Sequence, residues 1–298
     1  MTQYSAGGPQ LGDWSTIGSM RVSAVVTSRF RLDGGSMFGV VPRVLWEKKA
    51  PPDDRNRIAL SVNTLLVRAA DKLILIEPGM GSKYDRRKRD IYALEPVDAD
   101  ACLSRAGVAP GQIDIVIPTH LHLDHAGGST ALGAEGEALE YFPNAWFVVQ
   151  EAEWEAAVDP GPLEKGSYNA ADFLPLVDTG RLLLVEGTTE VAPGVRVELT
   201  GGHTRGHQVV RLRSEGEEAV YLGDIVPTTA HLKLNWLMAW DLVPQMVYAA
   251  KERLLQDAVE RGVTCFFPHD PDIAGCRLAR SGRGSFEVIE ETIIKPCG

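Results

Sequence analysis

The sequence lacks the features that would place the chain in a membrane, in a secretory pathway or on nucleic acid. It contains no run of about 18 apolar residues, so a membrane-spanning helix is not expected. Forty acidic residues outnumber 30 basic ones, giving a formal net charge of −10, which disfavours a surface that binds phosphate backbones. The first residues show no basic segment followed by an apolar one, so they do not look like a secretory signal. We therefore expect a cytoplasmic protein that binds neither membranes nor nucleic acid.

Cysteine is also scarce. The chain has four, Cys102, Cys265, Cys276 and Cys297, and they form no Cys-x-x-Cys pair. This scattered use does not indicate a disulfide framework and is typical of a reducing compartment. For Cys102 and Cys265 we expect small buried hydrophobic positions, and a metal-binding or catalytic role is the less favoured alternative.

Strand and helix patterns alternate along most of the 298 residues. Residues 1–20 are polar and contain several glycines and serines, which predicts a flexible or dimer-docking arm. No change of composition marks a linker in residues 21–298, so this part is predicted to be a single domain. Apolar, β-branched runs predict strands at 22–31, 58–69, 72–77, 113–117, 145–149, 181–186, 195–200, 208–212, 219–222 and 263–267. Helices are predicted at 98–106, 150–158 and 241–261, the last with Met246, Ala250, Leu254 and Ala258 on its apolar face. Residues 32–39 are expected to form a glycine-rich loop.

Histidine and aspartate recur just past the ends of predicted strands. The densest case follows strand 113–117 and reads Thr119-His120-Leu121-His122-Leu123-Asp124-His125-Ala126-Gly127-Gly128. His203, Asp224 and His269 follow three later strands. Because loops at the carboxyl ends of strands converge in α/β folds, these side chains are expected to form one site. Imidazole and carboxylate groups suit zinc and related divalent metals, and a chance cluster on a solvated loop is much less favoured.

The order of these motifs resembles the metallo-β-lactamase superfamily. The pattern is His-x-His-x-Asp-His, then His203-Thr204-Arg205-Gly206-His207, then Gly223-Asp224, then Phe267-Pro268-His269-Asp270. The resemblance covers the chain from about residue 22 onward. It implies an α/β fold of four αββα layers, in which two mixed sheets are flanked by helices.

The resemblance also implies two divalent metal ions, zinc foremost, with Mn, Fe, Co and Ni left open. His120, His122 and His203 would hold the first ion, and Asp124, His125 and His269 the second. Asp224 would bridge the two ions. His207 and Glu77 would stand behind the ligands and orient them. Two ions, two carboxylates and a bridging hydroxide leave a net charge of about +1, which attracts an anion or a developing oxyanion.

Such a pair of ions predicts hydrolysis, with a metal-bridging hydroxide attacking an ester or lactone and with Asp124 and Asp224 as the catalytic carboxylates. The pattern is most similar to N-acyl homoserine lactonases and to methyl-parathion-type organophosphate hydrolases, through residues 33–35, 123–128 and 202–208. Many of those lactonases have a tyrosine three residues after the bridging aspartate, where this chain has Pro227, so cleavage of acyl-homoserine lactones is left open. The alternatives are a phosphotriesterase or phosphodiesterase and, less favoured, a non-catalytic binding module.

An apolar, aromatic segment after Asp224 is expected to wall the pocket of a small hydrophobic substrate. The candidate pocket residues are Met37, Phe38, Trp46, His231, Trp236, Met238 and Trp240. Equally weighted alternatives place Trp236 and Trp240 in the core or in a dimer interface, Trp46 on an ordinary surface loop, and His231 on the surface. We expect a homodimer.

Overall fold

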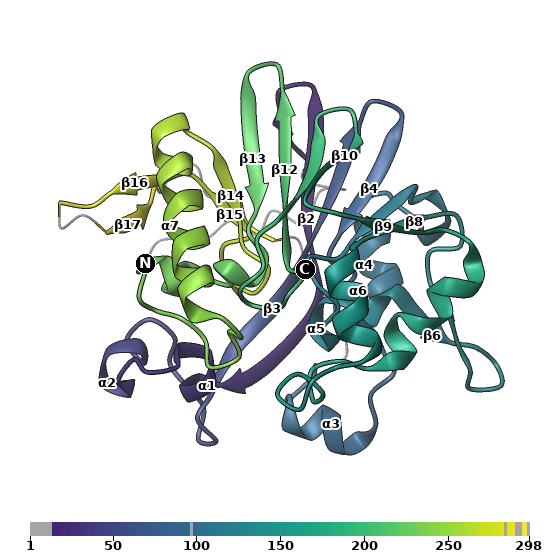
Figure 1. Ribbon diagram of the computed structural model, residues 1–298, viewed down its shortest axis with the longest axis horizontal. Helices are drawn as coiled ribbons and strands as arrows, with labels where there is room; N and C mark the ends of the chain where they lie inside the picture. The colour runs from purple at the N-terminus through teal and green to yellow at the C-terminus, as the bar shows by residue number, and fades with distance from the viewer. Residues whose placement is uncertain (1–13, 96–97, 283–284, 290–293, 297–298) are drawn as a thin grey trace, which may run out of the picture.

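Two β-sheets pack face to face in the computed structural model, which describes residues 14–95, 98–282, 285–289 and 294–296 (Figure 1). The first sheet has seven strands, in the order β1 (Ser15–Ile17), β2 (Met20–Asp33), β3 (Arg57–Ala69), β4 (Lys72–Ile76), β5 (Ile115–Ile117), β8 (Trp146–Gln150) and β9 (Leu182–Val185). The second has six, in the order β10 (Thr188–Ala192), β11 (Val195–Leu199), β12 (Gln208–Ser214), β13 (Glu217–Tyr221), β14 (Thr264–Phe266) and β15 (Gly275–Cys276). Two small hairpins, β6 (Thr130–Leu132) with β7 (Ala138–Glu140) and β16 (Leu278–Arg280) with β17 (Phe286–Val288), lie outside these sheets.

Both sheets are mixed, and their parallel strands position the loops that carry the candidate site residues. Strands β4, β5, β8 and β9 run parallel to one another, and β13 runs parallel to β14. The other strand pairs within the two sheets are antiparallel. Because parallel strands end at the same edge, the segments that follow β4, β5 and β8 emerge side by side, as do those that follow β13 and β14.

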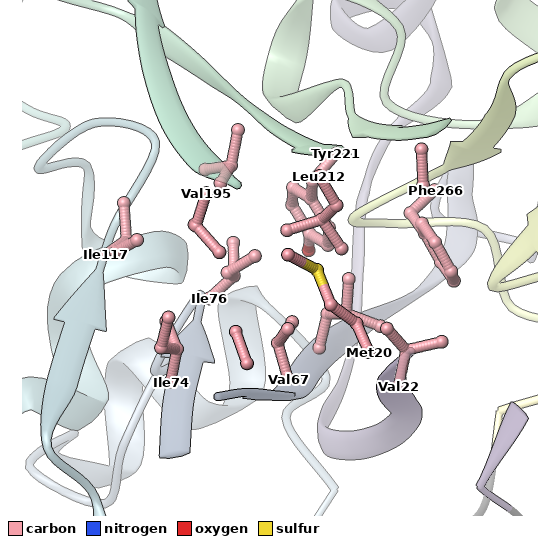
Figure 2. Packing of buried hydrophobic residues seen from close by; sticks show 14 of the residues in the cluster. Met20, Val22, Val67, Ile74, Ile76, Ile117, Val195, Leu212, Tyr221 and Phe266 are labelled. Carbon is pink, nitrogen blue, oxygen red and sulfur yellow. The ribbon is translucent and has the colours of Figure 1, made fainter. Parts of the chain in front are cut away.

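The core between the sheets is built from residues that alternate along the strands. Leu65 and Val67 of β3 face the second sheet, whereas Leu66 between them packs toward the opposite, outer face. Figure 2 shows Met20, Val22, Val67, Ile74, Ile76 and Ile117 of the first sheet close to Val195, Leu212, Tyr221 and Phe266 of the second. The period-2 pattern of the sequence therefore specifies which face of each strand is buried between the sheets.

Helices cover the two outer faces. The helices α4 (Ala99–Arg105) and α6 (Glu151–Val158) pack on the first sheet, and α7 (Pro244–Arg261) packs on the second. Asp98 caps α4 by accepting a hydrogen bond from the Ala101 amide at 3.0 Å, as its sequence position predicts. Gly262 ends α7 in the left-handed conformation, with φ of 67°. The predicted four-layer αββα sandwich is therefore confirmed.

Several local predictions need correction. Residues 34–38, expected in a loop, form the short helix α1 (Gly34–Phe38), because the Asp33 side chain accepts from the Ser36 amide at 2.8 Å and caps it. The excursion after it contains a second short helix, α2 (Arg43–Trp46). The long helix begins at Pro244 instead of residue 241, and Met246 is 47% exposed, so it lies off the buried face. Strand β10 was not predicted.

The predicted arm is only partly within the described residues. Residues 1–13 lie outside them, and residues 15–17 form β1, which pairs with the start of β2. Cys102, Cys265 and Cys276 are buried and free of disulfides, while Cys297 lies outside the described residues. No helix in the described part of the chain has the length and apolar character to cross a membrane.

The α7 layer generates a stability prediction. Leu254 is 1% exposed in the cluster between α7 and the second sheet, so Leu254→Ala is expected to lower the free energy of unfolding by about 2–5 kcal/mol. Met246→Ala on the same helix is the matched control and should change it by less than about 0.5 kcal/mol. Denaturant unfolding followed by circular dichroism measures both, and equal effects would contradict this assignment of the buried face.

Candidate metal centre

The seven residues predicted as metal ligands come together at the edge where the parallel strands end. His120 and His122 follow β5, and the short helix α5 (Leu123–Ala126) carries Asp124 and His125. The other three come from the second sheet: His203 lies between β11 and β12, Asp224 follows β13, and His269 follows β14. All of them are buried except Asp124, whose side chain is 15% exposed.

Their donor atoms form three overlapping groups. These are His120 with His122 and His203, His120 with His125 and Asp224, and Asp124 with His125 and His269, each with all ligand atoms within 4.8 Å of one another. The first and third groups share no residue. They are therefore two separate sets of three donors, side by side.

Asp224 lies between the two sets. Its Oδ2 atom is 3.3 Å from His203 Nε2, in the first set. Its Oδ1 atom is 3.5 Å from His125 Nε2 and 3.3 Å from His269 Nε2, in the second. One carboxylate thus presents one oxygen to each set, which is the geometry that a bridging ligand needs.

The chemistry of the cluster fits divalent metal ions. His120 Nε2 and Asp224 Oδ1 are buried and have no hydrogen-bond partner in the described structure, although buried polar atoms normally have one. Burial, followed by the charge of neighbouring histidines, holds the pKa of His120 and of His122 well below the ordinary value. Both rings are therefore neutral, the state in which imidazole binds a metal.

Glu77 holds His125 from behind. It follows β4, is fully buried, and its Oε1 lies 3.1 Å from His125 Nδ1. The same carboxylate accepts from the Thr119 amide at 3.2 Å and from the Thr119 hydroxyl. Glu77 has φ of 63°, a strained conformation for a residue with a side chain, and such strain is concentrated at functional sites.

His207 holds the backbone of Asp224. Its Nε2 accepts a hydrogen bond from the Asp224 amide at 3.0 Å, and its Nδ1 lies 2.7 Å from Thr200 Oγ1. Gly223 permits this approach, since a Cβ there would meet His207 Nε2 at 2.4 Å. The structure thus places His207 behind the donor sets, as the sequence predicts.

Asp241 was not singled out from the sequence. Its Oδ1 lies 2.9 Å from His203 Nδ1, and its Oδ2 accepts from the Met238 amide at 2.9 Å. It was placed inside the predicted helix 241–261, and no local spacing links it to a histidine 38 residues earlier. Only the folded chain shows that it orients His203.

A cavity of about 290 Å³ opens beside the donor sets. It is lined by Leu32, Met37, Tyr92, His122, Leu123, Asp124, Leu163, Gly166, Ser167, His203, Asp224, Met238, Trp240 and His269. Of the predicted pocket residues, Met37, Met238 and Trp240 line it. Leu32, Tyr92 and Leu163 were not foreseen, because they come from segments that no motif connects to the site, and Leu123 lies within the histidine motif but was not named as a pocket residue.

The other four predicted pocket residues do not line the cavity and pack behind the residues that do. Phe38 stacks on Trp46 and on His231, with ring centroids 5.3 and 4.5 Å apart, and meets the edge of Trp236 at 5.5 Å. Trp46 is 2% exposed, so its side chain anchors an otherwise exposed segment and does not lie on the surface. Gly34 is required beneath it, because a Cβ at that position would meet the indole at 2.4 Å.

His231 is neither on the surface nor against the cavity. It is fully buried, with Nδ1 2.8 Å from Thr228 Oγ1 and Nε2 2.9 Å from the Met37 carbonyl oxygen. Burial and, next, the charge of Lys251 lower the pKa of His231 to about 3. The ring therefore stays neutral in the folded chain at pH values where a histidine in the unfolded chain, with a pKa of about 6.5, takes up a proton.

This difference predicts a pH dependence of stability. As the pH falls from 6.5 toward 3, the unfolded chain binds a proton at His231 that the folded chain does not, so the free energy of unfolding decreases. The wild type should lose up to about 1.4 kcal/mol per pH unit more than His231→Gln, in which this group is absent. Urea unfolding between pH 6.5 and 4.5 measures the two slopes. Equal slopes would show that His231 titrates normally.

Comparisons with known proteins agree with the family resemblance that the sequence motifs show. A family model described as the metallo-beta-lactamase superfamily matches residues 57–269. An N-acyl homoserine lactonase from Bacillus thuringiensis is 30% identical over 168 residues, covering 56% of this chain and 60% of the relative. The N-acyl homoserine lactonase AttM of Rhizobium radiobacter is 28% identical over 175 residues, covering 56% and 61%. The chain thus spans about 60% of the length of these relatives.

Solved structures share the fold over nearly the whole chain. A probable metal-dependent hydrolase from Staphylococcus aureus superposes with a TM-score of 0.85 at 31% identity, covering 94% of this chain and 100% of the other. AidC, a dizinc quorum-quenching lactonase solved with a homoserine product, gives a TM-score of 0.78 at 18% identity, covering 95% and 98%. At that identity the second similarity is one of fold alone.

Proposed function

The chain belongs to the metallo-beta-lactamase superfamily, and on that premise we propose that it is a dinuclear metal-dependent hydrolase of small, uncharged, hydrophobic esters or lactones. The main observation in favour of this function is the position of Asp224. One of its oxygens faces the first set of three donors, and the other oxygen faces the second set. A purely structural metal site would be closed by four protein ligands and would need no such bridge.

The residues present could hold two divalent ions, with zinc as the first choice. His120, His122 and His203 would bind one and Asp124, His125 and His269 the other, with Asp224 shared. The chemistry that such a pair supplies when bound is an activated water and a polarised substrate oxygen. We also propose that the bound metal is zinc, that the protein forms a homodimer and that it is cytoplasmic.

The two carboxylates have different surroundings and so different roles. Asp224 is 6% exposed and lies between the donor sets, where it keeps their spacing fixed. Asp124 is more open to the cavity and lies 3.8 Å from His125 Nε2 and 3.6 Å from His269 Nε2. In this position Asp124 can hold the proton of the attacking water and orient it toward the substrate.

The cavity wall selects the substrate class. Its described lining contains leucine, methionine and tryptophan side chains but no lysine or arginine. A negatively charged substrate would find no fixed cation there besides the metals, whereas an apolar ester would bury its groups against the wall. This favours esters and lactones, and disfavours phosphodiesters.

The lactonase relatives support a lactone as one substrate class. The position where many lactonases carry a tyrosine is Pro227, and its carbonyl oxygen accepts a hydrogen bond from the His269 amide at 2.9 Å. Pro227 offers no hydroxyl, and the tyrosine of the described lining is Tyr92, from another segment. We therefore propose esters and lactones as a class of substrate. Phosphotriesters, which are uncharged, are the second candidate because the same wall accommodates them.

Metal removal and one substitution test the mechanism. The zinc-loaded protein should hydrolyse aryl esters or lactones, a chelator should abolish this activity, and added zinc should restore it. Asp224→Asn should lower kcat by at least about 100-fold, because it removes the charge shared by both donor sets. Asp272→Asn, an exposed carboxylate near His269, is the matched control and should keep full activity. A wild-type protein that binds no divalent ion, or an active Asp224→Asn variant, would refute the mechanism.

A substrate panel separates the two candidate functions. Aryl esters, lactones and neutral phosphotriesters of similar size are compared on the same metal-loaded sample through kcat/KM. Turnover of esters or lactones is expected to exceed that of phosphotriesters. Phosphotriester turnover without any ester or lactone turnover would replace the first candidate by the second.

A further inference from the structure

A buried carboxylate that belongs to neither donor set lies directly behind the three-histidine set. Glu153 is in the first turn of α6, which begins where β8 ends, and it is 1% exposed. A buried anion is costly unless hydrogen bonds satisfy it, so its partners indicate what it does.

Both oxygens of Glu153 are fully engaged. Oε1 accepts hydrogen bonds from the Leu121 amide at 2.8 Å and from the Tyr168 hydroxyl at 3.0 Å. Oε2 accepts from the Thr204 hydroxyl at 2.5 Å and from the Gly206 amide at 3.2 Å. A carboxylate is the side chain that offers about four acceptor positions and no donor, as this arrangement requires.

These partners are the immediate neighbours of the three histidines. Leu121 stands between His120 and His122, and Thr204 follows His203. His122 and His203 are 81 residues apart in the chain, yet His203 Nε2 lies 3.3 Å from His122 Nδ1. Glu153 is thus a direct link between the two loops that must meet for the first donor set to exist.

Tyr168 adds a second connection to the same set. Its ring packs edge-on against His122, with centroids 4.9 Å apart, and its backbone forms an isolated β-bridge with His122. Because its hydroxyl donates to Glu153, the ring that supports His122 is held by the same carboxylate.

Gly206 allows the loop after His203 to approach α6 closely. A Cβ at Gly206 would meet the Glu153 backbone nitrogen at 2.1 Å and its Cβ at 2.4 Å. Only glycine allows the loop after His203 to reach the first turn of α6. The glycine of the His-Thr-x-Gly-His motif therefore serves the contact with Glu153 in this chain.

We propose that Glu153 is a positioning residue that fixes His120, His122 and His203 in one metal-binding geometry. The inference rests on the metal site of the proposed function and extends it to a residue on a separate helix. The second donor set is held by other groups: Glu77 faces His125, and the Ser61 carbonyl oxygen lies 2.9 Å from His269 Nδ1. Loss of Glu153 should therefore weaken one metal site and spare the other.

The test measures zinc affinity of the apoprotein at each set separately, by competition with a chromophoric chelator. The His269→Ala background retains the three-histidine set, and the His203→Ala background retains the set of Asp124 and His125. Glu153→Gln keeps the size of the side chain but turns one acceptor group into a donor that faces other donors. In the first background it should weaken zinc binding about 10–100-fold, as loss of an orienting partner does elsewhere. In the second background we expect less than about a threefold change.

Two further variants complete the design. Glu155→Gln alters an exposed carboxylate on the same helix and should leave both affinities unchanged. Thr204→Val removes one of the four hydrogen bonds to Glu153 and should produce a smaller loss in the same direction, at the three-histidine set only. It replaces Glu153→Gln if circular dichroism shows that the latter does not fold.

The outcomes are distinct. Equal weakening of both sets would show that Glu153 only supports the fold, and an unchanged affinity at the three-histidine set would show that it positions nothing there. Either result overturns the inference and leaves the proposed function intact. A wild-type protein that binds no zinc would overturn both.

Discussion

Seven ionisable side chains are brought into one cluster, and burying six of them is the constraint on which the rest of the structure depends. Charged or half-satisfied groups away from water cost several kcal/mol unless they are paired, neutral or bound to a cation. His120 and His122, whose pKa values are lowered, and Asp224, with one oxygen toward each donor set, meet this constraint only if the surrounding chain holds them in place. The mixed sheets provide this placement, because their parallel strands end at one edge.

Several of the donors are fixed by groups from other elements. Glu77 after β4 contacts His125, His207 before β12 holds the Asp224 amide, and Asp241 contacts His203. Glu153 on α6 joins the loops of the first set. The cluster is therefore the meeting point of both sheets, and its geometry depends on contacts between residues far apart in the sequence.

The seven candidate ligands could be named from the sequence because they lie in short motifs whose spacing is readable without a structure, and the structure brings them together. The αββα layers follow from the resemblance and from the period-2 pattern of the strands. Asp241 and Glu153 could not be foreseen, since Asp241 contacts a histidine 38 residues away, and Glu153 accepts from Leu121 and Thr204, which are 32 and 51 residues away. For the predicted pocket residues, the sequence left cavity wall and core packing open: some of them line the cavity, and the others pack behind it. Periodicity does not show whether Phe38 faces a cavity or a second aromatic ring, and only tertiary packing decides this.

We propose above all that this chain holds two metal ions that share Asp224. A crystal structure of the zinc-loaded protein with anomalous data at the zinc edge tests it most directly. We expect two anomalous peaks about 3.5–4 Å apart, one at His120, His122 and His203 and one at Asp124, His125 and His269, with a different oxygen of Asp224 bound to each. A single peak, or two peaks that leave Asp224 unbound, would contradict it.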